Sequence, residues 1–570
     1  MTIHTIAPVG GLAHVAGDTS KPLLELTIPQ LLARTVKENG PREAAVFVEQ
    51  NRRFTWDEFA ATVDDLAAGL LVLGLETGDR VAMWSPNRWE WLVTQFATAR
   101  VGMILVNINP AYRLSELEYA LNKVGCRALV TAAAFKTSDY LGMIRTLAPE
   151  IDTATPGRLK TAKLPKLEIV IRVGDDKTPG MFNFADVLAM GQGHDSAQLD
   201  RISAGLDPND AVNIQFTSGT TGAPKGATLT HRNIVNNADQ VTTGMKFTKD
   251  DRLCIPVPFY HCFGMSMGTL GCVTKGATMV VPSEGFDPLA TLKAVSREKC
   301  TALYGVPTMF VAMLDHPQFP EFDFSALRTG IMAGAPCPVE VMKKVGSLMN
   351  MREVTIAYGM TETSPVSFQS AVDDPLEKRV STVGRIRPHL EVKVIGESGK
   401  TVPVGQSGEL CTKGYSVMQG YWDDPERTAE AIDADGWMHT GDLATIDDEG
   451  YANIVGRVKD MVIRGGENVY PREIEEFLYR HPKIAQVQVF GVPDKKYGEE
   501  IAAWVVVAPG QSLTEDEVKD FCKGQIAHYK VPRYVQFRAE LPMTVTGKPQ
   551  KFIMRDTMID ELGLTVEKTA

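Results

Sequence analysis

Apolar residues in the first quarter of the chain alternate between helical spacing and the short continuous runs of buried strands. After a capping box at Thr55-Trp56-Asp57-Glu58, residues Phe59, Val63, Leu66 and Leu70 recur at helical spacing. Strand patterns cover 79–84, 103–108 and 128–131, and further helix patterns cover 89–101 and 114–124. This alternation of strands with helices predicts an α/β fold with parallel, doubly wound sheets.

The pattern changes twice farther along the chain. Strand and helix signals alternate again over 211–304, but from about residue 390 the strands shorten and turns multiply, which predicts a small β-rich subdomain. A second unit begins near residue 461, with helix-start signals at Pro471 and Thr514. We therefore assign 1–459 to a large N-terminal domain and 460–570 to a small α+β C-terminal domain.

The composition is that of a globular protein, with 44% hydrophobic and 23% charged residues among 570. A net charge of −11 argues against nonspecific nucleic-acid binding, which requires a basic surface. The eight cysteines form no Cys-x-x-Cys and the ten histidines no His-Glu-x-x-His, so neither a disulfide framework nor a zinc site is predicted. Residues 1–20 lack the features of a signal peptide, and the longest apolar run, 501–509, is too short to span a bilayer. These properties predict a reduced, soluble, cytoplasmic protein with no nucleic-acid partner and no integral membrane segment, and they leave a homo-oligomer open.

A glycine- and hydroxyl-rich stretch at 217–227 lies between a predicted strand, 211–216, and a helix that Thr230 can cap. We predict that it forms a loop. Glycines let backbone N–H groups approach a phosphate, hydroxyls donate hydrogen bonds, and Lys225 supplies a positive charge. It is not a Walker A loop, because Ala-Pro separates Gly222 from Lys225. By composition alone, a flexible surface loop is the simpler interpretation.

Other stretches combine glycine, charge and hydroxyl groups in ways that suit a nucleotide. Glu362 follows a predicted strand, and a carboxylate at a strand end beside a phosphate loop could hold Mg²⁺. Asp442 could accept hydrogen bonds from ribose hydroxyls, and Lys548 lies in a hydroxyl-rich turn. Taken singly, each is equally compatible with an ordinary strand end or surface turn, as are the charged stretches 456–460 and 464–468 at the domain junction.

Gly264-Met265-Ser266-Met267-Gly268 matches the Gly-x-Ser-x-Gly nucleophile elbow of serine hydrolases. Such an elbow needs a strand that runs directly into the serine. The preceding Pro256 and Pro258 oppose a central strand. We interpret the match as a coincidence and keep a serine hydrolase that uses Ser266 as an alternative from a different class.

The nucleotide-like stretches, in this order and spacing, resemble the adenylate-forming superfamily. That superfamily contains acyl- and aryl-CoA synthetases, nonribosomal adenylation domains and firefly luciferases. The resemblance rests on 217–227, 358–362, 440–442, 456–460 and 547–548, and it covers the chain from about residue 30. The runs 227–237 and 464–471 are similar to those of the medium-chain fatty acyl-CoA synthetase branch.

The resemblance implies that a carboxylate is first joined to AMP and then passed to the thiol of coenzyme A. It implies three catalytic roles: Lys548 bridges the acyl carboxylate and the α-phosphate, Glu362 binds Mg²⁺ with help from Thr217, and His261 gates the carboxylate. The positions that it assigns to ATP or coenzyme A are Thr217, Ser218, Gly219, Thr220, Thr221, Gly222, Lys225, Gly334, Ala335, Pro336, Tyr358, Gly359, Met360, Thr361, Asp442, Arg457, Arg464, Gly465 and Gly466.

The resemblance also implies a mobile C-terminal domain that rotates about Asp460 between the two steps. Lys548 then leaves the site, and Gly465 and Gly466 line a pantetheine tunnel, where the lack of a Cβ leaves room for a thin chain. Val306 and 330–334 match positions that line the acyl pocket. Pro549 departs from the family pattern, which usually has an aliphatic residue after the catalytic lysine; because it biases Lys548 toward an extended backbone, the geometry of this turn stays open.

The leading hypothesis is an ATP-dependent fatty acid–CoA ligase for medium-chain acids, with ATP, Mg²⁺, coenzyme A and a small carboxylic acid as its ligands. A ligase for aryl or short, thio-substituted carboxylates is the nearest alternative, followed by an enzyme that loads a carrier protein. A catalytically inactive binding protein is disfavoured, because Glu362, Asp442, Arg457 and Lys548 are all present.

Overall fold

The fold was analysed in a computed structural model that describes residues 7–217, 224–335, 337–464, 467–494, 497–523, 525–544 and 547–564. An eight-stranded sheet has the order β10-β9-β6-β4-β5-β11-β12-β22. Its strands are β4 (Arg80–Trp84), β5 (Ile104–Asn107), β6 (Ala128–Thr131), β9 (Ile169–Arg172), β10 (Phe182–Asn183), β11 (Ala211–Thr217), β12 (Lys225–Thr230) and β22 (Gly420–Tyr421). Pairing is parallel from β10 to β11, and β12 and β22 add antiparallel strands at one edge.

A nine-stranded sheet has the order β19-β18-β17-β16-β15-β13-β14-β2-β3. Its strands are β2 (Glu43–Phe47), β3 (Arg52–Thr55), β13 (Arg252–Cys254), β14 (Thr278–Val281), β15 (Ala302–Gly305), β16 (Thr329–Ala333), β17 (Glu353–Gly359), β18 (Val366–Gln369) and β19 (Arg385–Ile386). The six strands from β17 to β2 are parallel to one another. The predicted α/β class with parallel, doubly wound sheets is therefore confirmed.

Helices cover both faces of each sheet. Successive residues of a strand point to opposite faces: Val81 of β4 joins a central core with Met279 of β14, whereas Ala82 faces an outer core. The central core lies between the sheets and contains α1 (Ile28–Asn39), α2 (Trp56–Val72), α3 (Trp89–Arg100), α8 (His231–Gly244), a π-helical segment (Phe263–Leu270) and α9 (Gly271–Lys275). The outer faces are covered by α4 (Leu114–Lys123) and α5 (Tyr140–Leu147) on one sheet, and by α10 (Pro288–Arg297), α11 (Pro307–Leu314) and α12 (Val339–Leu348) on the other.

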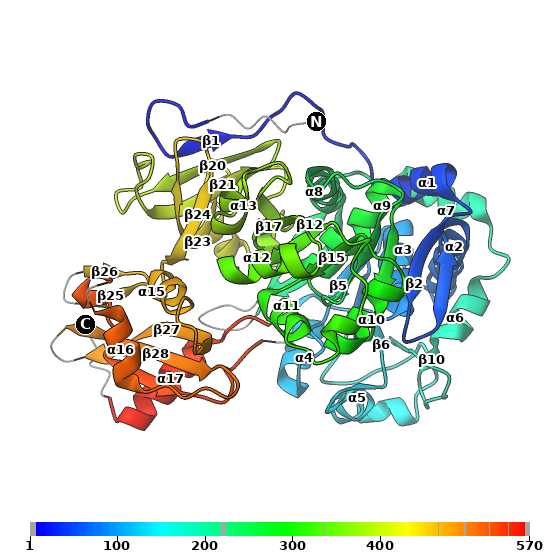
Figure 1. Ribbon diagram of the computed structural model, residues 1–570. Helices are drawn as coiled ribbons and strands as arrows, with labels where there is room; N and C mark the ends of the chain where they lie inside the picture. Colours follow the sequence, from blue (N-terminus) through cyan, green and yellow to red (C-terminus); the bar gives the residue numbers. More distant parts are fainter. Residues whose placement is uncertain are drawn as a thin grey trace.

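The two smaller units also match the sequence pattern (Figure 1). The β-rich subdomain is a five-stranded sheet of β1 (His14–Ala16), β20 (Leu390–Ile395), β21 (Gly408–Gly414), β23 (Met438–Ile446) and β24 (Ala452–Arg457). The C-terminal domain, orange to red in Figure 1, contains β25 (Val462–Arg464), β26 (Glu467–Val469), β27 (Ile484–Asp494), β28 (Gly498–Val507), β29 (Tyr534–Phe537), α15 (Pro471–Leu478), α16 (Glu515–Cys522) and α17 (Lys551–Leu562). Asp460 lies between β24 and β25, where the sheets change; its role as a hinge stays a prediction.

The remaining α-helices and β-strands are short. They are β7 (Ala134–Phe135), β8 (Ser138–Asp139), α6 (Phe184–Gly191), α7 (Ser196–Ala204), α13 (Leu376–Ser381) and α14 (Pro425–Ala431). Within the described part of the chain, no helix combines the length and the apolar character needed to cross a membrane.

The predicted loop at 217–227 is wrong at both ends. Thr217 is the last residue of β11, and Lys225–Thr230 form β12, which runs antiparallel to β11. The strand was missed because Leu229 is its one large apolar residue; Leu229 and the small Ala227 are fully buried in the central core. The predicted helix start is confirmed, since the Thr230 side chain accepts a hydrogen bond from the backbone N–H of Asn233.

Ser266 has the surroundings of a structural residue. It lies in the fully buried π-helical segment Phe263–Leu270, and its hydroxyl donates to the carbonyl oxygen of Ser364 at 3.2 Å. A nucleophile elbow would need a strand leading directly into this position and an exposed hydroxyl. The interpretation of the motif as a coincidence is therefore supported.

Candidate active site

The Glu362 carboxylate lies at the end of β17, on a short 3₁₀ turn (Thr361–Thr363). It is 5% exposed, and its Oε1 accepts hydrogen bonds from the Thr217 hydroxyl at 3.1 Å and from the Tyr421 hydroxyl at 2.9 Å. Gly359 makes this exit from the strand possible, because a Cβ there would lie 1.7 Å from the carbonyl oxygen of Pro365. A buried carboxylate is thus fixed in place by two hydroxyl donors.

Tyr421 was not identified from the sequence. It lies on β22, opposite Ala227 of β12, and its hydroxyl both donates to Glu362 and accepts from the ammonium of Lys225 at 2.9 Å. Lys225 is thereby linked to the metal-site candidate through a tyrosine. No spacing rule connects Tyr421 to residues two hundred positions earlier, so only the pairing of β12 with β22 could reveal it.

The Thr217–Glu362 pair fits a magnesium ion. A hydroxyl oxygen and a carboxylate oxygen lie 3.1 Å apart, and such hard oxygen ligands are those that Mg²⁺ prefers. Among the described residues, Glu362 Oε2 accepts no hydrogen bond, so this oxygen stays available to a cation.

A second acidic group is held on the β-rich subdomain. Asp442 is 6% exposed and is paired with Arg457 in the register of β23 and β24, with 2.9 Å between Arg457 Nε and Asp442 Oδ1. The Tyr358 hydroxyl donates to Asp442 Oδ2 at 2.6 Å. Burial, and then the negative charge of Asp442, raises the pKa of Tyr358, so the phenol stays protonated and remains a donor. The predicted positions Tyr358, Asp442 and Arg457 therefore form one hydrogen-bonded group.

The strand ends next to this group carry other predicted positions. The register pairs Ala333 of β16 with Ala357 of β17, which makes Gly334 and Tyr358 neighbours. Gly334 has φ +85°, a left-handed conformation, and a Cβ there would lie 4.0 Å from Lys548 Cε. The end of β16 therefore faces the lysine delivered by the C-terminal domain.

Lys548 lies in a turn that contacts the N-terminal domain. A Cβ added to Gly547, which has φ +75°, would lie 3.0 Å from Thr308 Oγ1 and 3.0 Å from Val306 Cγ2. The backbone N–H of Lys548 donates to the Thr544 hydroxyl at 2.9 Å, which holds the turn in shape. The C-terminal domain thus presents this turn to the start of α11.

Pro549 is accommodated without loss of a hydrogen bond. It forms an isolated antiparallel bridge with Met543. The flanking bonds are donated by Thr544 N–H to the Lys548 carbonyl at 2.7 Å and by Gln550 N–H to the Pro542 carbonyl at 2.9 Å. Because position 549 is a non-hydrogen-bonded site of this pair, a proline there removes no donor that the turn uses.

The electrostatic surroundings of Lys548 connect all the groups above. Its side chain is exposed to the cleft. The protein that surrounds the cleft reduces the solvation of the ammonium group and so lowers the pKa of Lys548. Among the charged neighbours, Asp442 and Glu362 oppose this shift and Arg457 adds to it, so these three charges act on one ammonium group. Lysine, both carboxylates and the arginine therefore share one cleft.

His261 also lies close to Lys548. Burial, followed by the charge of Lys548, lowers the pKa of His261 to about 3, so the imidazole is neutral near pH 7. Its Nδ1 accepts the backbone N–H of Phe263 at 3.2 Å, which leaves the proton on Nε2. His261 is thus a neutral hydrogen-bond donor rather than a cation.

Several predicted positions do not join this cleft or are not described. Residues 218–223, Pro336, Gly465 and Gly466 lie outside the described residues. Arg464 forms a bidentate pair with Glu500 inside the C-terminal domain, at 2.7 and 2.9 Å. Ala335, Met360 and Thr361 follow β16 and β17 as expected, and Thr361 Oγ1 lies 3.8 Å from the Cys262 sulfur.

A cavity of about 390 Å³ extends from the lysine turn between the two domains. Its walls include Val306, Thr308 and Met309 from the N-terminal domain, and Leu541 and Gly547 from the C-terminal domain. The mixture of apolar side chains with a few polar groups is typical of small-molecule sites.

Comparisons with known proteins agree with this arrangement. The model of the AMP-binding enzyme family matches residues 32–422, and that of the AMP-binding enzyme C-terminal domain matches residues 473–548. The zebrafish (Danio rerio) mitochondrial medium-chain acyl-CoA ligase ACSF2 is 48% identical over 97% of this chain and 91% of its own, and the human protein of the same name is 45% identical over 98% and 91%. The crystal structure of the anthranilate CoA ligase AuaEII with anthranoyl-AMP superposes with a TM-score of 0.85 at 25% identity, over 95% of this chain and 99% of that one. The chain belongs to the AMP-binding enzyme family of the adenylate-forming superfamily.

Proposed function

We propose that this protein is an ATP-dependent, AMP-forming fatty acid–CoA ligase that acts on medium-chain acids. The observation that carries the proposal is the meeting of Glu362, Asp442 and Lys548 in one cleft, with the lysine supplied by the C-terminal domain. Two acidic anchors and one cation suit a nucleoside triphosphate that reacts at its α-phosphorus, because the leaving pyrophosphate and the ribose are bound on different sides of the reacting atom.

In the first step, a carboxylate oxygen attacks the α-phosphorus, a P–O bond to pyrophosphate breaks, and acyl-AMP forms. Lys548 stabilises the charge on the α-phosphate and the acyl carboxylate, which is the largest kind of contribution in such reactions. Asp442 accepts hydrogen bonds from the ribose hydroxyls, and Arg457 holds this carboxylate in position through the contact of its Nε with Oδ1 at 2.9 Å. His261, as a neutral donor, positions the carboxylate.

The stretch 217–225 binds the phosphates that leave. Thr217 and Glu362 would hold Mg²⁺, which would neutralise phosphate charge. Lys225 contributes to binding of these phosphates, and its ammonium is held in place by the Tyr421 hydroxyl. The bond that forms is therefore to the α-phosphate, and the β- and γ-phosphates depart together.

In the second step, the thiol of coenzyme A attacks the acyl carbonyl, and AMP leaves. We propose that the C-terminal domain rotates about Asp460 between the steps, which removes Lys548 and brings Arg464, Gly465 and Gly466 to the cleft. The lysine turn belongs to the C-terminal domain and meets Val306 and Thr308 of the N-terminal domain, so its position depends on how the two domains are docked.

The names of the ACSF2 relatives favour medium-chain fatty acids. A second candidate substrate class is aryl carboxylates, because the superposed AuaEII structure contains anthranoyl-AMP. We keep the cytoplasm as the proposed compartment, although the names of these relatives place them in mitochondria.

The test is a carboxylate panel. Purified protein is incubated with ATP, Mg²⁺ and straight-chain acids from acetate to stearate, together with benzoate and anthranilate. Pyrophosphate release without coenzyme A, and acyl-CoA formation with it, should both be highest for hexanoate to dodecanoate. A preference for the aryl acids would select the second candidate, and formation of ADP in place of AMP would refute the proposed reaction.

A further inference from the structure

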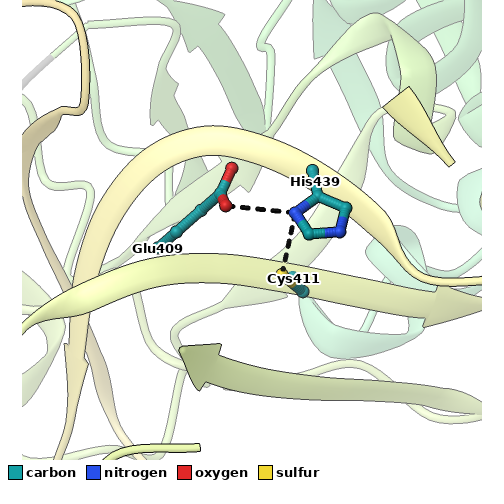
Figure 2. A group of neighbouring side chains, drawn as sticks. All are labelled: Glu409, Cys411 and His439. Carbon is teal, nitrogen blue, oxygen red and sulfur yellow. Dashed lines mark hydrogen bonds and ion pairs between the residues drawn. The ribbon is translucent and has the colours of Figure 1, made fainter. Parts of the chain in front are cut away.

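A cysteine, a histidine and a glutamate converge on the β-rich subdomain, outside the proposed active-site cleft (Figure 2). Glu409 and Cys411 lie on β21 and His439 lies on β23, where Cys411 and His439 are direct partners in the register. Glu409 Oε2 is 3.0 Å and Cys411 Sγ is 3.6 Å from the same atom, His439 Nδ1. Figure 2 shows both side chains directed at this one nitrogen.

These distances are close to the edges of a tetrahedral zinc site. With Zn–S of about 2.3 Å and Zn–N of about 2.05 Å, a tetrahedral angle places sulfur and nitrogen about 3.6 Å apart. Similar bond lengths place oxygen and nitrogen about 3.3 Å apart, against 3.0 Å in the structure, and all three ligand atoms lie within 4.8 Å of one another. Without a cation, one Nδ1 cannot satisfy both neighbours with a single well-directed hydrogen bond.

Neighbouring groups also orient the side chains of Glu409 and His439. The other carboxylate oxygen of Glu409 accepts the backbone N–H of Gly441 at 3.2 Å. His439 Nε2 lies 3.7 Å from Asp433 Oδ2, and Asp433 is itself held by backbone N–H groups of Asp435 and Trp437. Histidines that bind metals through one nitrogen commonly present the other to a carboxylate in this way.

We propose that Glu409, Cys411 and His439 form a binding site for a thiophilic divalent cation of the Zn²⁺ class. Three protein ligands leave the fourth tetrahedral position to water, which is the open type of zinc coordination. Thiolate and imidazole ligands select zinc-like ions over Mg²⁺, which prefers oxygen. The site is therefore chemically distinct from the Thr217–Glu362 pair.

Binding involves one proton. Cys411 is a free, buried cysteine, and its thiol carries the proton that the cation replaces. On binding, the S–H bond breaks, an Sγ–metal bond forms, and the proton passes to the solvent. The side chains of His439 and Glu409 are 32% and 26% exposed, which gives the cation access from the surface.

The test is a Co²⁺ titration of the full chain after treatment with a chelator. The wild type should bind one Co²⁺ with a thiolate-to-cobalt charge-transfer band, and Zn²⁺ but not Mg²⁺ should remove that band by competition. Cys411→Ala should abolish the band, and Asp433→Asn should weaken affinity about 10- to 100-fold. Matched controls are Cys126→Ala, another buried cysteine, and His194→Gln, another histidine beside an aspartate; both should bind as the wild type does.

The wild-type titration decides the matter even if a variant fails to fold. Absence of the thiolate band in the folded wild type would overturn the proposal. Equal Co²⁺ binding by the wild type and a folded Cys411→Ala variant would also overturn it, and the three residues would then be a hydrogen-bonded cluster only.

Discussion

The two ends of the active-site cleft are built in different ways. At one end, Glu362 is 5% exposed and accepts hydrogen bonds from the hydroxyl groups of Thr217 and Tyr421. All three residues belong to the N-terminal domain. At the other end, Lys548 is exposed, and its turn meets the N-terminal domain through Gly547, beside Val306 and Thr308. The first end is fixed by buried hydrogen bonds, and the second depends on docking between domains.

This difference suits a reaction with two steps. The groups proposed to hold pyrophosphate and Mg²⁺ are preorganised, which spares the reorganisation that would otherwise slow the chemistry. A lysine needed in one step only can be supplied by the other domain, because rotation of that domain would remove it from the cleft. Perturbation of the lysine end should therefore separate the half-reactions, whereas perturbation of the Glu362 end should weaken ATP binding.

Replacement of the lysine gives the largest expected effect. Lys548→Ala should reduce pyrophosphate exchange by about 10²- to 10³-fold, the scale for loss of one preorganised charge-stabilising group. Thioester formation from supplied acyl-adenylate should stay close to that of the wild type. Lys523→Ala, at a lysine that is 69% exposed in the same domain, serves as the control. Unchanged exchange in Lys548→Ala would remove the lysine from the proposed mechanism.

Docking of the lysine turn can be perturbed without touching the lysine. Gly547→Ala adds a Cβ 3.0 Å from Thr308 and Val306, and overpacking of about 2 kcal/mol would slow the first half-reaction about 30-fold. Gly510→Ala is the matched control: its φ of +74° is nearly that of Gly547, but nothing lies within 4 Å. Equal losses of pyrophosphate exchange in the two variants would show that backbone strain, and not docking, limits the reaction.

The fixed end should respond more weakly and in a different parameter. Tyr421→Phe removes one hydroxyl from Glu362 and one partner from Lys225, and a loss of about 1 kcal/mol would raise KM for MgATP about fivefold. Tyr451→Phe removes a comparable hydroxyl from Asp374, where the bond is 2.7 Å, and should leave KM unchanged. A decrease in kcat alone for Tyr421→Phe would contradict a role of this tyrosine in the binding of MgATP.

The smallest effect concerns pH. Because the protein around the cleft reduces the solvation of the ammonium and so lowers the pKa of Lys548, the ammonium form is present below that pKa and is lost as pH rises through it. The alkaline limb of kcat/KM for ATP should therefore fall below the pH range of an ordinary lysine. Lys548→Arg keeps its charge at high pH and should abolish this limb, whatever its absolute rate. Persistence of the limb in that variant would assign it to another group.

Sequence reasoning went far for the fold and part of the way for the site. Helix starts at Thr55, Thr230 and Thr514 were predictable because capping is local, and all three side chains accept the expected backbone N–H. Strand β12 was missed, because Lys225–Thr230 contains small residues whose burial depends on the neighbouring strand. Tyr421 was missed for a similar reason.

The sequence by itself determined the alternating α/β pattern, the β-rich and C-terminal units, and the residue types of the candidate site. These features depend on local spacing, which a chain carries without folding. Only the tertiary structure decided that Tyr421 links Lys225 to Glu362, that Pro549 takes a position needing no N–H, and that Cys411 and His439 meet across two strands. Such relations depend on strand register and domain docking, which are set by contacts between residues far apart in the chain.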